Sequence, residues 1–346
     1  MSKTATADAG VAEHTDAPHL ASSAVVTGVA ALGDAVLMSE GAVIRSRDGG
    51  VRISTGSAVI ENAVVIGTSR VPTVIGRRTT FGHRCLVVGA TVGDLCEIGN
   101  ASILMPGARL GDRVFLGEGT LVPAGMTLPD GAVAVGRPAR VVRTANDADL
   151  ERLRGLRGGH LSIPPHTSNT VGPRLEGLAM GQLYDYRGVL PTIADSAVLF
   201  PTAEVTGDVV VGDSTVIGAG VKIIGDSHGP VRIGSDVQIL ENTVLHLLPD
   251  NDLIISDGVI VGPGAMIHGC RIGTGSVVEP GAIVCDGSVV GAGCIVRAGA
   301  VVKQRSRFGD GIDIDGFPAI EVGRIASVER PAWAFTLDDL PRASTT

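Results

Sequence analysis

The feature that most constrains this chain is an aliphatic residue at every sixth position over long stretches. One such series runs from Ile272 to Val302 and another from Val205 to Ile223. A period of six is neither the period of an α-helix nor the simple alternation of a strand. It is typical of a parallel β-helix, in which each six-residue unit forms one short strand and one corner of a triangular coil. Because a single coil buries too little apolar surface to be stable alone, the coils must stack.

The composition agrees with this interpretation. The chain has 49 glycines, and 44% of its residues are hydrophobic while only 3% are aromatic. Glycine suits the tight corners of a β-helix because it adopts positive φ without penalty. Small aliphatic side chains suit its narrow interior. We therefore predict an all-β protein built from left-handed parallel β-helices of the hexapeptide-repeat kind, with short flanking helices.

The whole pattern occurs twice, at an offset of 180 residues. Gly136-Arg137-Pro138-Ala139 matches Gly316-Phe317-Pro318-Ala319, and Gly49 to Ile53 matches Gly229 to Ile233. Two tandem β-helices are therefore predicted, and Asn146 is the expected cap of a short helix between them. The predicted segments are a disordered N-terminal tail (1–20), a first β-helix (21–143), a helix and linker (144–183), a second β-helix (184–325) and a C-terminal tail (326–346).

Other features argue against several classes of protein. A net charge of −8 argues against a nucleic-acid surface. The sequence shows no apolar run long enough to span a membrane and no signal-peptide pattern. The five cysteines are odd in number and form no C-x-x-C pair, so we expect small core residues in a reducing compartment. These observations predict a cytoplasmic protein.

Several motifs of the second half resemble the γ-class carbonic anhydrase-like family, in the order that the family shows them. They are Tyr184 to Gly188, Val231 to Gly234, Val244 to His246, Ile267 to Cys270, and Gly316 to Ala319. The family binds a metal, usually zinc, through three histidines. The resemblance implies ligands at His246 and His268, and a third in a Gly-His pair. Here that pair is replaced by Gly262-Pro263, and proline cannot bind a metal.

The first half shows the complementary pattern. At the three metal positions it has Ile66, His83 and Val88, so it keeps only the histidine that the second half has lost. In the family the metal lies between neighbouring β-helices of a trimer. The resemblance therefore implies one composite site of His83, His246 and His268, formed where a first repeat meets a second repeat. Three neutral imidazoles leave one position open for water, and such a site suits zinc, ferrous iron or cobalt alike.

The polar residues that surround the metal in this family are partly kept. Asp226 matches the family's aspartate, and Gln238 and Glu241 belong to a second matching segment. The resemblance makes Glu241, Gln238 and Asp226 the candidate catalytic residues, which would orient the ligands and tune the acidity of bound water. Asp226 is also expected to pair with Arg45 or Arg47 across a subunit boundary. Equally, Asp226 and Glu241 could be structural ion-pair partners.

The resemblance predicts a zinc-dependent lyase or hydrolase whose metal hydroxide attacks CO2, or a small carbonyl compound, or runs the reverse reaction. One alternative is a metal-free scaffold member of the family. Another is a hexapeptide-repeat acyltransferase, which uses a histidine as general base without a metal. The composite site also predicts a homo-oligomer with mixed first-repeat and second-repeat contacts. The opposite junction, built from Ile66, Val88 and Pro263, should be apolar and closed.

Overall fold

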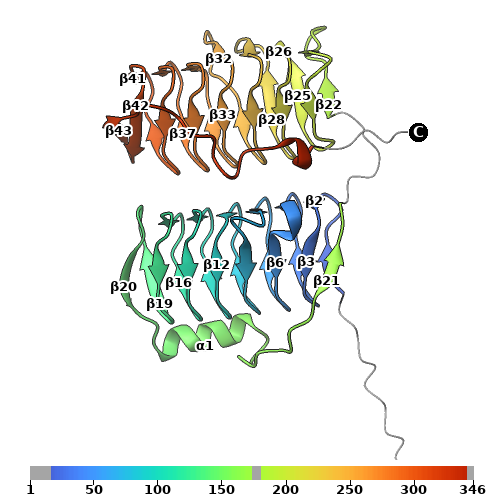
Figure 1. Cartoon of the computed structure of the whole chain (residues 1–346), viewed down its shortest axis with the longest axis vertical. Helices are drawn as coiled ribbons and strands as arrows, with labels where there is room; N and C mark the ends of the chain where they lie inside the picture. The colour runs from blue at the N-terminus through green and yellow to red at the C-terminus, as the bar shows by residue number, and fades with distance from the viewer. Residues whose placement is uncertain (1–16, 174–180, 341–346) are drawn as a thin grey trace, which may run out of the picture.

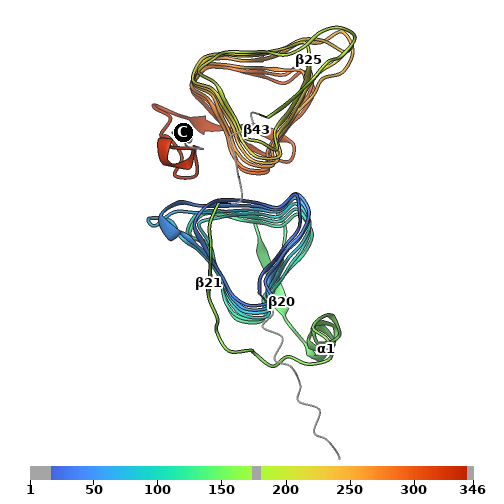
Figure 2. The ribbon, with the colours of Figure 1, turned by 90° about the vertical axis from the view of Figure 1, so that its right-hand side faces the viewer.

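A computed structural model describes residues 17–173 and 181–340. It contains two parallel β-helices that lie side by side, each with a triangular cross-section when viewed along its axis (Figures 1 and 2). Three sheets form the sides of each triangle, and successive strands of one sheet come from successive coils. The prediction of an all-β chain with two tandem β-helices is therefore confirmed.

The first helix has sheets that we call A1, B1 and C1. Sheet A1 contains β1 (His19–Leu20), β4 (Leu37–Met38), β7 (Ala58–Val59), β10 (Thr80–Phe81), β13 (Glu97–Ile98), β16 (Phe115–Leu116), β19 (Ala132–Val135) and β20 (Arg140–Thr144). Sheet B1 contains β2 (Val25–Gly28), β5 (Val43–Ser46), β8 (Val64–Gly67), β11 (Leu86–Val88), β14 (Ile103–Leu104) and β17 (Leu121–Val122). Sheet C1 contains β3 (Ala30–Leu32), β6 (Val51–Ile53), β9 (Thr73–Ile75), β12 (Thr91–Val92), β15 (Arg109–Leu110), β18 (Thr127–Leu128) and β21 (Asn169–Val171).

The second helix repeats this plan with sheets A2, B2 and C2, lettered to match the first. Sheet A2 contains β24 (Val198–Leu199), β27 (Val216–Ile217), β30 (Gln238–Ile239), β33 (Ile260–Val261), β36 (Val277–Val278), β39 (Ile295–Val296), β42 (Ile312–Gly316) and β43 (Ala319–Arg324). Sheet B2 contains β22 (Gln182–Tyr184), β25 (Glu204–Gly207), β28 (Lys222–Gly225), β31 (Val244–Leu245), β34 (Met266–Ile267), β37 (Ile283–Val284) and β40 (Val301–Val302). Sheet C2 contains β23 (Thr192–Ile193), β26 (Val209–Val211), β29 (Val231–Ile233), β32 (Leu253–Ile255), β35 (Arg271–Ile272), β38 (Val289–Val290) and β41 (Arg307–Phe308).

The six-residue period fills the interior of each helix. In sheet B1, the inward residues Val65, Val87 and Leu104 stack in register through three coils and are fully buried. The equivalent column of sheet B2 contains Leu245 and Ile267, which are buried in the same way. Each helix thus has its own continuous aliphatic core.

The segment after the first helix begins with helix α1 (Asp147–Leu156) on its outside (Figure 1). The Asn146 side chain accepts a hydrogen bond from the backbone N–H of Asp149, and the Asp149 side chain accepts one from the N–H of Asn146. This reciprocal cap confirms the predicted start of the helix. The chain then returns along the first helix and adds β21 to sheet C1, antiparallel to β3.

The two helices meet at a third apolar cluster. Sheet B1 faces sheet A2, and residues 326–340, including the short 3-10 turn η2 (Leu337–Asp339), fill the wedge between them (Figure 2). The predicted C-terminal tail is therefore a packed segment as far as residue 340, with Trp333 and Phe335 buried. Residues 1–16 and 341–346 of the two predicted tails lie outside the described residues. Sheets B2 and A1 face away from this junction.

Candidate metal centre

Two of the predicted ligands lie together at one edge of the second helix. His246 follows β31 and His268 follows β34, and these strands pair so that Leu245 is opposite Ile267. Because the register is parallel, the two histidines occupy the same corner of adjacent coils. Their ring centroids are 6.3 Å apart, and the rings are nearly perpendicular. This corner joins sheet B2 to sheet C2 and is opposite to sheet A2, which makes the junction.

A third histidine joins them from the preceding coil. Asp226 and His228 follow β28, and the His228 ring centroid lies 5.5 Å from that of His246. Asp226 Oδ1 is 3.2 Å from His228 Nδ1, and its Oδ2 is 3.8 Å from His246 Nε2. His228 was not among the site residues predicted from the sequence. The available signal was the Asp-x-His sequence directly after a strand, one coil before His246.

A second carboxylate flanks the corner on its other side. Asp286 follows β37, and its Oδ2 lies 3.4 Å from His268 Nδ1. Its Oδ1 accepts hydrogen bonds from the backbone N–H of Leu248 and from the Asn251 side chain. A carboxylate fixed beside an imidazole orients the ring. We call Asp226, His228, His246, His268 and Asp286 the histidine corner.

Two imidazole nitrogens of the histidine corner suit a cation. His228 Nδ1 and His268 Nδ1 are buried, and among the described residues neither makes a hydrogen bond. Both lie within ion-pair distance of a carboxylate, but the angles there are unsuited to a hydrogen bond. The side chains themselves remain about one-third exposed. The corner therefore offers several nitrogen donors at an edge that solvent can reach.

The remaining predicted ligand lies elsewhere. His83 is on the turn between β10 and β11, where sheet A1 meets sheet B1. Its side chain is 55% exposed, and its Nδ1 lies 2.8 Å from Glu61 Oε2. Within one chain, the structure thus brings together His246 and His268 but not His83.

Some positions where the resemblance implies a metal-binding histidine hold an apolar residue instead, and these lie inside the junction. Ile66 and Val88 are buried there, and Trp333 packs over them around a residual cavity of about 10 Å³. Pro263 is buried as well. Around Ile66 and Val88, the junction inside the chain is apolar and closed. The histidines are therefore missing where the two helices of the chain meet, and present at edges that face outwards.

Two of the three candidate catalytic residues lie in that junction. Glu241 Oε1 is 2.6 Å from Arg45 Nε, and both side chains are buried. The Gln238 side chain donates to the Phe335 carbonyl and accepts from the Phe335 N–H. Both residues lie on or directly after sheet A2, at a different edge from the histidine corner. In the single chain, Gln238 and Glu241 therefore join the two helices and are not beside His246 and His268.

Within the chain, Asp226 does not pair with an arginine of the first repeat, and its expected pairing across a subunit boundary stays a prediction. Arg45 pairs with Glu241 and lies 3.6 Å from Asp339, and Arg47 also contacts Asp339. Asp226 instead faces His228 and His246. The physical reason is that sheet B1 faces sheet A2, whereas Asp226 lies at the outer edge of sheet B2.

Cys270 follows His268 by two residues but is 2% exposed and packs in the core of the second helix. Burial raises the pKa of its thiol well above the ordinary range, and only the thiolate is a good metal ligand. This agrees with the prediction of a packing role. All five cysteines are free, and four of them are buried.

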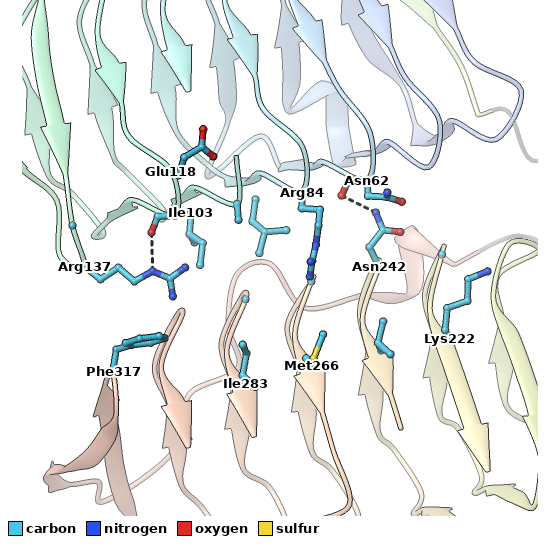
Figure 3. A pocket seen from close by; sticks show the side chains of 18 residues that line it. Asn62, Arg84, Ile103, Glu118, Arg137, Lys222, Asn242, Met266, Ile283 and Phe317 are labelled. Atoms are coloured by element: carbon cyan, nitrogen blue, oxygen red, sulfur yellow. Dashed lines mark hydrogen bonds between the residues drawn. The ribbon is translucent and has the colours of Figure 1, made fainter. Parts of the chain in front are cut away.

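A separate groove of about 750 Å³ runs between sheet B2 and the turns that join sheets A1 and B1 (Figure 3). Met266 and Ile283 line it from the second helix, and Arg84 and Glu118 from the first. At one end, the Asn242 side chain donates to the carbonyls of Gly41 and Asn62 and joins the two helices. The groove contains no residue of the histidine corner.

Comparison with known proteins supports the assignment of the fold. No protein-family model matches the chain. A carbonic anhydrase from Geobacillus kaustophilus is 41% identical over 102 residues, which are 28% of this chain and 56% of that protein. The carnitine operon protein CaiE from Escherichia coli K12 is 32% identical over 95 residues, 28% of this chain and 48% of that protein. The chain thus spans about half the length of the curated relatives it matches.

Among solved structures, a hexapeptide transferase family protein from Anaplasma phagocytophilum is 28% identical with a TM-score of 0.40, covering 42% of this chain and 85% of that one. The stacked coils give the chain a β-helix fold, and its sequence is similar to the carbonic anhydrase and CaiE proteins named above. More particularly, its resemblance to the carbonic anhydrase-like branch of the hexapeptide-repeat proteins, as two tandem units, is confirmed. Among the described residues, no helix is long and apolar enough to cross a membrane.

Proposed function

We propose that the histidine corner binds a divalent metal and that the protein is a metal-dependent lyase or hydrolase similar to γ-class carbonic anhydrases. The observation that carries the proposal is the stacking of His246 and His268 at one outward edge, beside buried imidazole nitrogens without hydrogen-bond partners. A buried, unpaired polar group costs about 1–3 kcal/mol. A corner with only a structural role would have no reason to keep two of them. Zinc is the expected metal, with ferrous iron or cobalt as equivalents for such donors.

The residues of the corner have separate tasks in this proposal. When bound, the metal supplies Lewis acidity, which lowers the pKa of water at an open position. His246 and His268 supply nitrogens from adjacent coils. Asp286, held by Leu248 and Asn251, has its Oδ2 3.4 Å from His268 Nδ1 and would balance the charge of a cation at the corner. Substrates of matching size are CO2 or bicarbonate, or a small carbonyl compound.

The third ligand that the sequence proposes is His83 of a neighbouring chain. His83 is exposed, and neither His83 nor the pair His246 and His268 belongs to the apolar cluster of the junction. The lost positions, Ile66 and Val88, are those covered by Trp333. This distribution supports a composite site in a homo-oligomer that mixes first and second repeats.

The experiment is a measurement of metal content after anaerobic purification without chelator, followed by CO2 hydration and ester hydrolysis assays. We expect about one metal per chain, because each chain holds one complete set of three histidines. His246→Ala should remove metal and activity together, and in the composite arrangement His268→Ala should do the same. A protein that stays metal-free after addition of zinc would instead support the scaffold alternative. Activity that depends on coenzyme A and survives chelation would support the acyltransferase alternative.

A further inference from the structure

The structure assigns a metal site to Asp226, His228 and His246 that is complete within one chain. We call these three residues the in-chain set. The inference rests on the proposed function and deepens it, because it names a third ligand that needs no second chain. It differs from the composite site in using a carboxylate and His228 in place of His268 and His83.

The geometry is close to that of a bound ion. One ligand atom from each of Asp226, His228 and His246 can be chosen so that all three lie within 4.8 Å of one another. In a tetrahedral zinc site the bonds are about 2.0–2.2 Å, so ligand atoms stand about 3.4 Å apart. Asp226 Oδ1 lies 3.2 Å from His228 Nδ1, and Asp226 Oδ2 lies 3.8 Å from His246 Nε2, so both distances are comparable with this separation.

The hydrogen bonding of the Asp226–His228 turn leaves ligand atoms of the in-chain set available to a metal. Asp226 Oδ1 accepts a hydrogen bond from the backbone N–H of His228 at 2.9 Å. That bond fixes the turn, but it leaves His228 Nδ1 buried and unpaired among the described residues. The carboxylate and the two rings face the same point from adjacent coils. A cation there would satisfy the unpaired nitrogen and balance the Asp226 charge.

The turn that presents His228 is tightly built. A Cβ on Gly229 would lie 2.0 Å from the Asn251 carbonyl oxygen and 2.6 Å from Leu247 Cδ1. Only glycine permits this approach, which packs the turn against the loop after His246. Leu247 is fully buried and anchors that loop. The position of His228 over His246 is therefore set by packing around the backbone.

The donor set identifies the class of ion. Two imidazole nitrogens and one carboxylate oxygen suit zinc, ferrous iron or cobalt, whereas calcium and magnesium prefer oxygen ligands alone. Three protein ligands also leave one position open for water or substrate. The in-chain set shares His246 with the composite site. The two sets therefore compete for one ligand and can be told apart by their other members.

The in-chain set needs no second copy, whereas the composite site needs a contact between copies that differs from the one inside the chain. Inside the chain, sheet A2 packs on sheet B1. A second copy that repeated this contact would place its sheet A1 on sheet B2, beside the first helix of the original chain. Its own second helix, attached to its sheet B1, would then crowd that same first helix. His228 meets no such obstacle.

The test is a titration of chelator-stripped protein with Zn²⁺, and with Co²⁺ for its visible spectrum, at protein concentrations spanning a hundredfold range. The variants are His228→Ala and Asp226→Asn, compared with His83→Ala and His268→Ala, which remove ligands of the composite site only. We expect a dissociation constant independent of protein concentration. His228→Ala and Asp226→Asn should weaken binding at least tenfold, while the other two variants keep it within about threefold. Circular dichroism of the metal-free variants checks that each is folded.

Three results would overturn the inference. Unchanged zinc binding in folded His228→Ala protein would show that His228 is not a ligand. Loss of binding in His83→Ala or His268→Ala, with affinity that rises with protein concentration, establishes the composite site and leaves the proposed function standing. If the wild-type chain binds neither zinc nor cobalt, both the inference and the proposed function are contradicted.

Discussion

Arg45 Nε lies 2.6 Å from Glu241 Oε1, and both side chains are almost completely buried between the two β-helices. Arg45 Nη2 also donates to the Trp333 carbonyl, and the guanidinium carbon lies 4.5 Å from the centre of the Phe335 ring. One side chain of the first helix thus contacts the second helix and the C-terminal segment together. Glu241, which the family resemblance assigned to a metal site, therefore stabilises the contact between the two helices.

Replacing Arg45 by alanine should destabilise the protein by about 3–5 kcal/mol, because Glu241 would be left as an unpaired buried charge. The measurement is urea unfolding followed by circular dichroism. Arg47→Ala is the matched control, since Arg47 contacts Asp339 from a more exposed position and should lose less. Equal losses in the two variants would show that the buried pair does not hold the junction. Metal affinity should stay unchanged in folded Arg45→Ala protein.

Trp333 is the only tryptophan of the chain and is buried over Ile66 and Val88. Trp333→Ala should cost about 3–5 kcal/mol, since it removes a large buried side chain. In the wild type, the tryptophan emission should shift to longer wavelength when the junction opens. Leu337→Ala, at an 85% exposed position of the same segment, should change stability by less than about 0.5 kcal/mol. Comparable losses in both variants would contradict the described packing of the segment.

Alanine substitutions at Gly281 and Gly275 distinguish the cost of backbone strain from the cost of a clash between the two helices. Both have φ of +67°, but a Cβ on Gly281 would lie 2.6 Å from Ile103 Cδ1 of the first helix, whereas Gly275 has open space. Each alanine substitution carries a similar strain of about 1 kcal/mol. Gly281→Ala should lose about 1–3 kcal/mol more than Gly275→Ala, because overpacking adds to the strain. Thermal unfolding of the pair measures this difference, and equal melting temperatures would argue against the contact.

The buried cysteines predict a loss of stability in alkali. Burial raises the pKa of Cys85 and of Cys96 from 9.0 to about 12. Between these values the unfolded chain loses the thiol protons while the folded chain retains them, so stability falls as pH rises from about 9 to 12. The free energy of unfolding, measured over this range, should fall less steeply in the Cys85→Ala/Cys96→Ala variant. The same slope in both proteins would contradict the raised pKa values.

The repeating architecture was predictable because it depends on a local rule. Each six-residue unit places one aliphatic side chain in the interior, so a column such as Leu104 and Val122, 18 residues apart, can be identified from spacing alone. The duplication and the cap at Asn146 were predictable for the same reason. The closed junction at Ile66 and Val88 followed from comparing the two halves position by position.

Features that depend on how the two helices pack were not predictable in this way. Residues 326–340 were predicted to be a tail, although Trp333 and Phe335 stand out in a chain with so few aromatic residues. Their role depends on the wedge between sheets B1 and A2, which no local pattern describes. His228 was missed because its approach to His246 depends on the close contact at Gly229. The contacts of Gln238 with Phe335 and of Glu241 with Arg45 depend on the same packing.

The most direct test of the account is the metal content of His246→Ala beside the wild type, both prepared without chelator and then supplied with zinc. His246 belongs to the in-chain set and to the composite site, so its loss removes a ligand under either arrangement. The account predicts about one tightly bound zinc per wild-type chain and none in the folded variant. Equal zinc content in the two proteins, or a wild type that binds no metal, would contradict it.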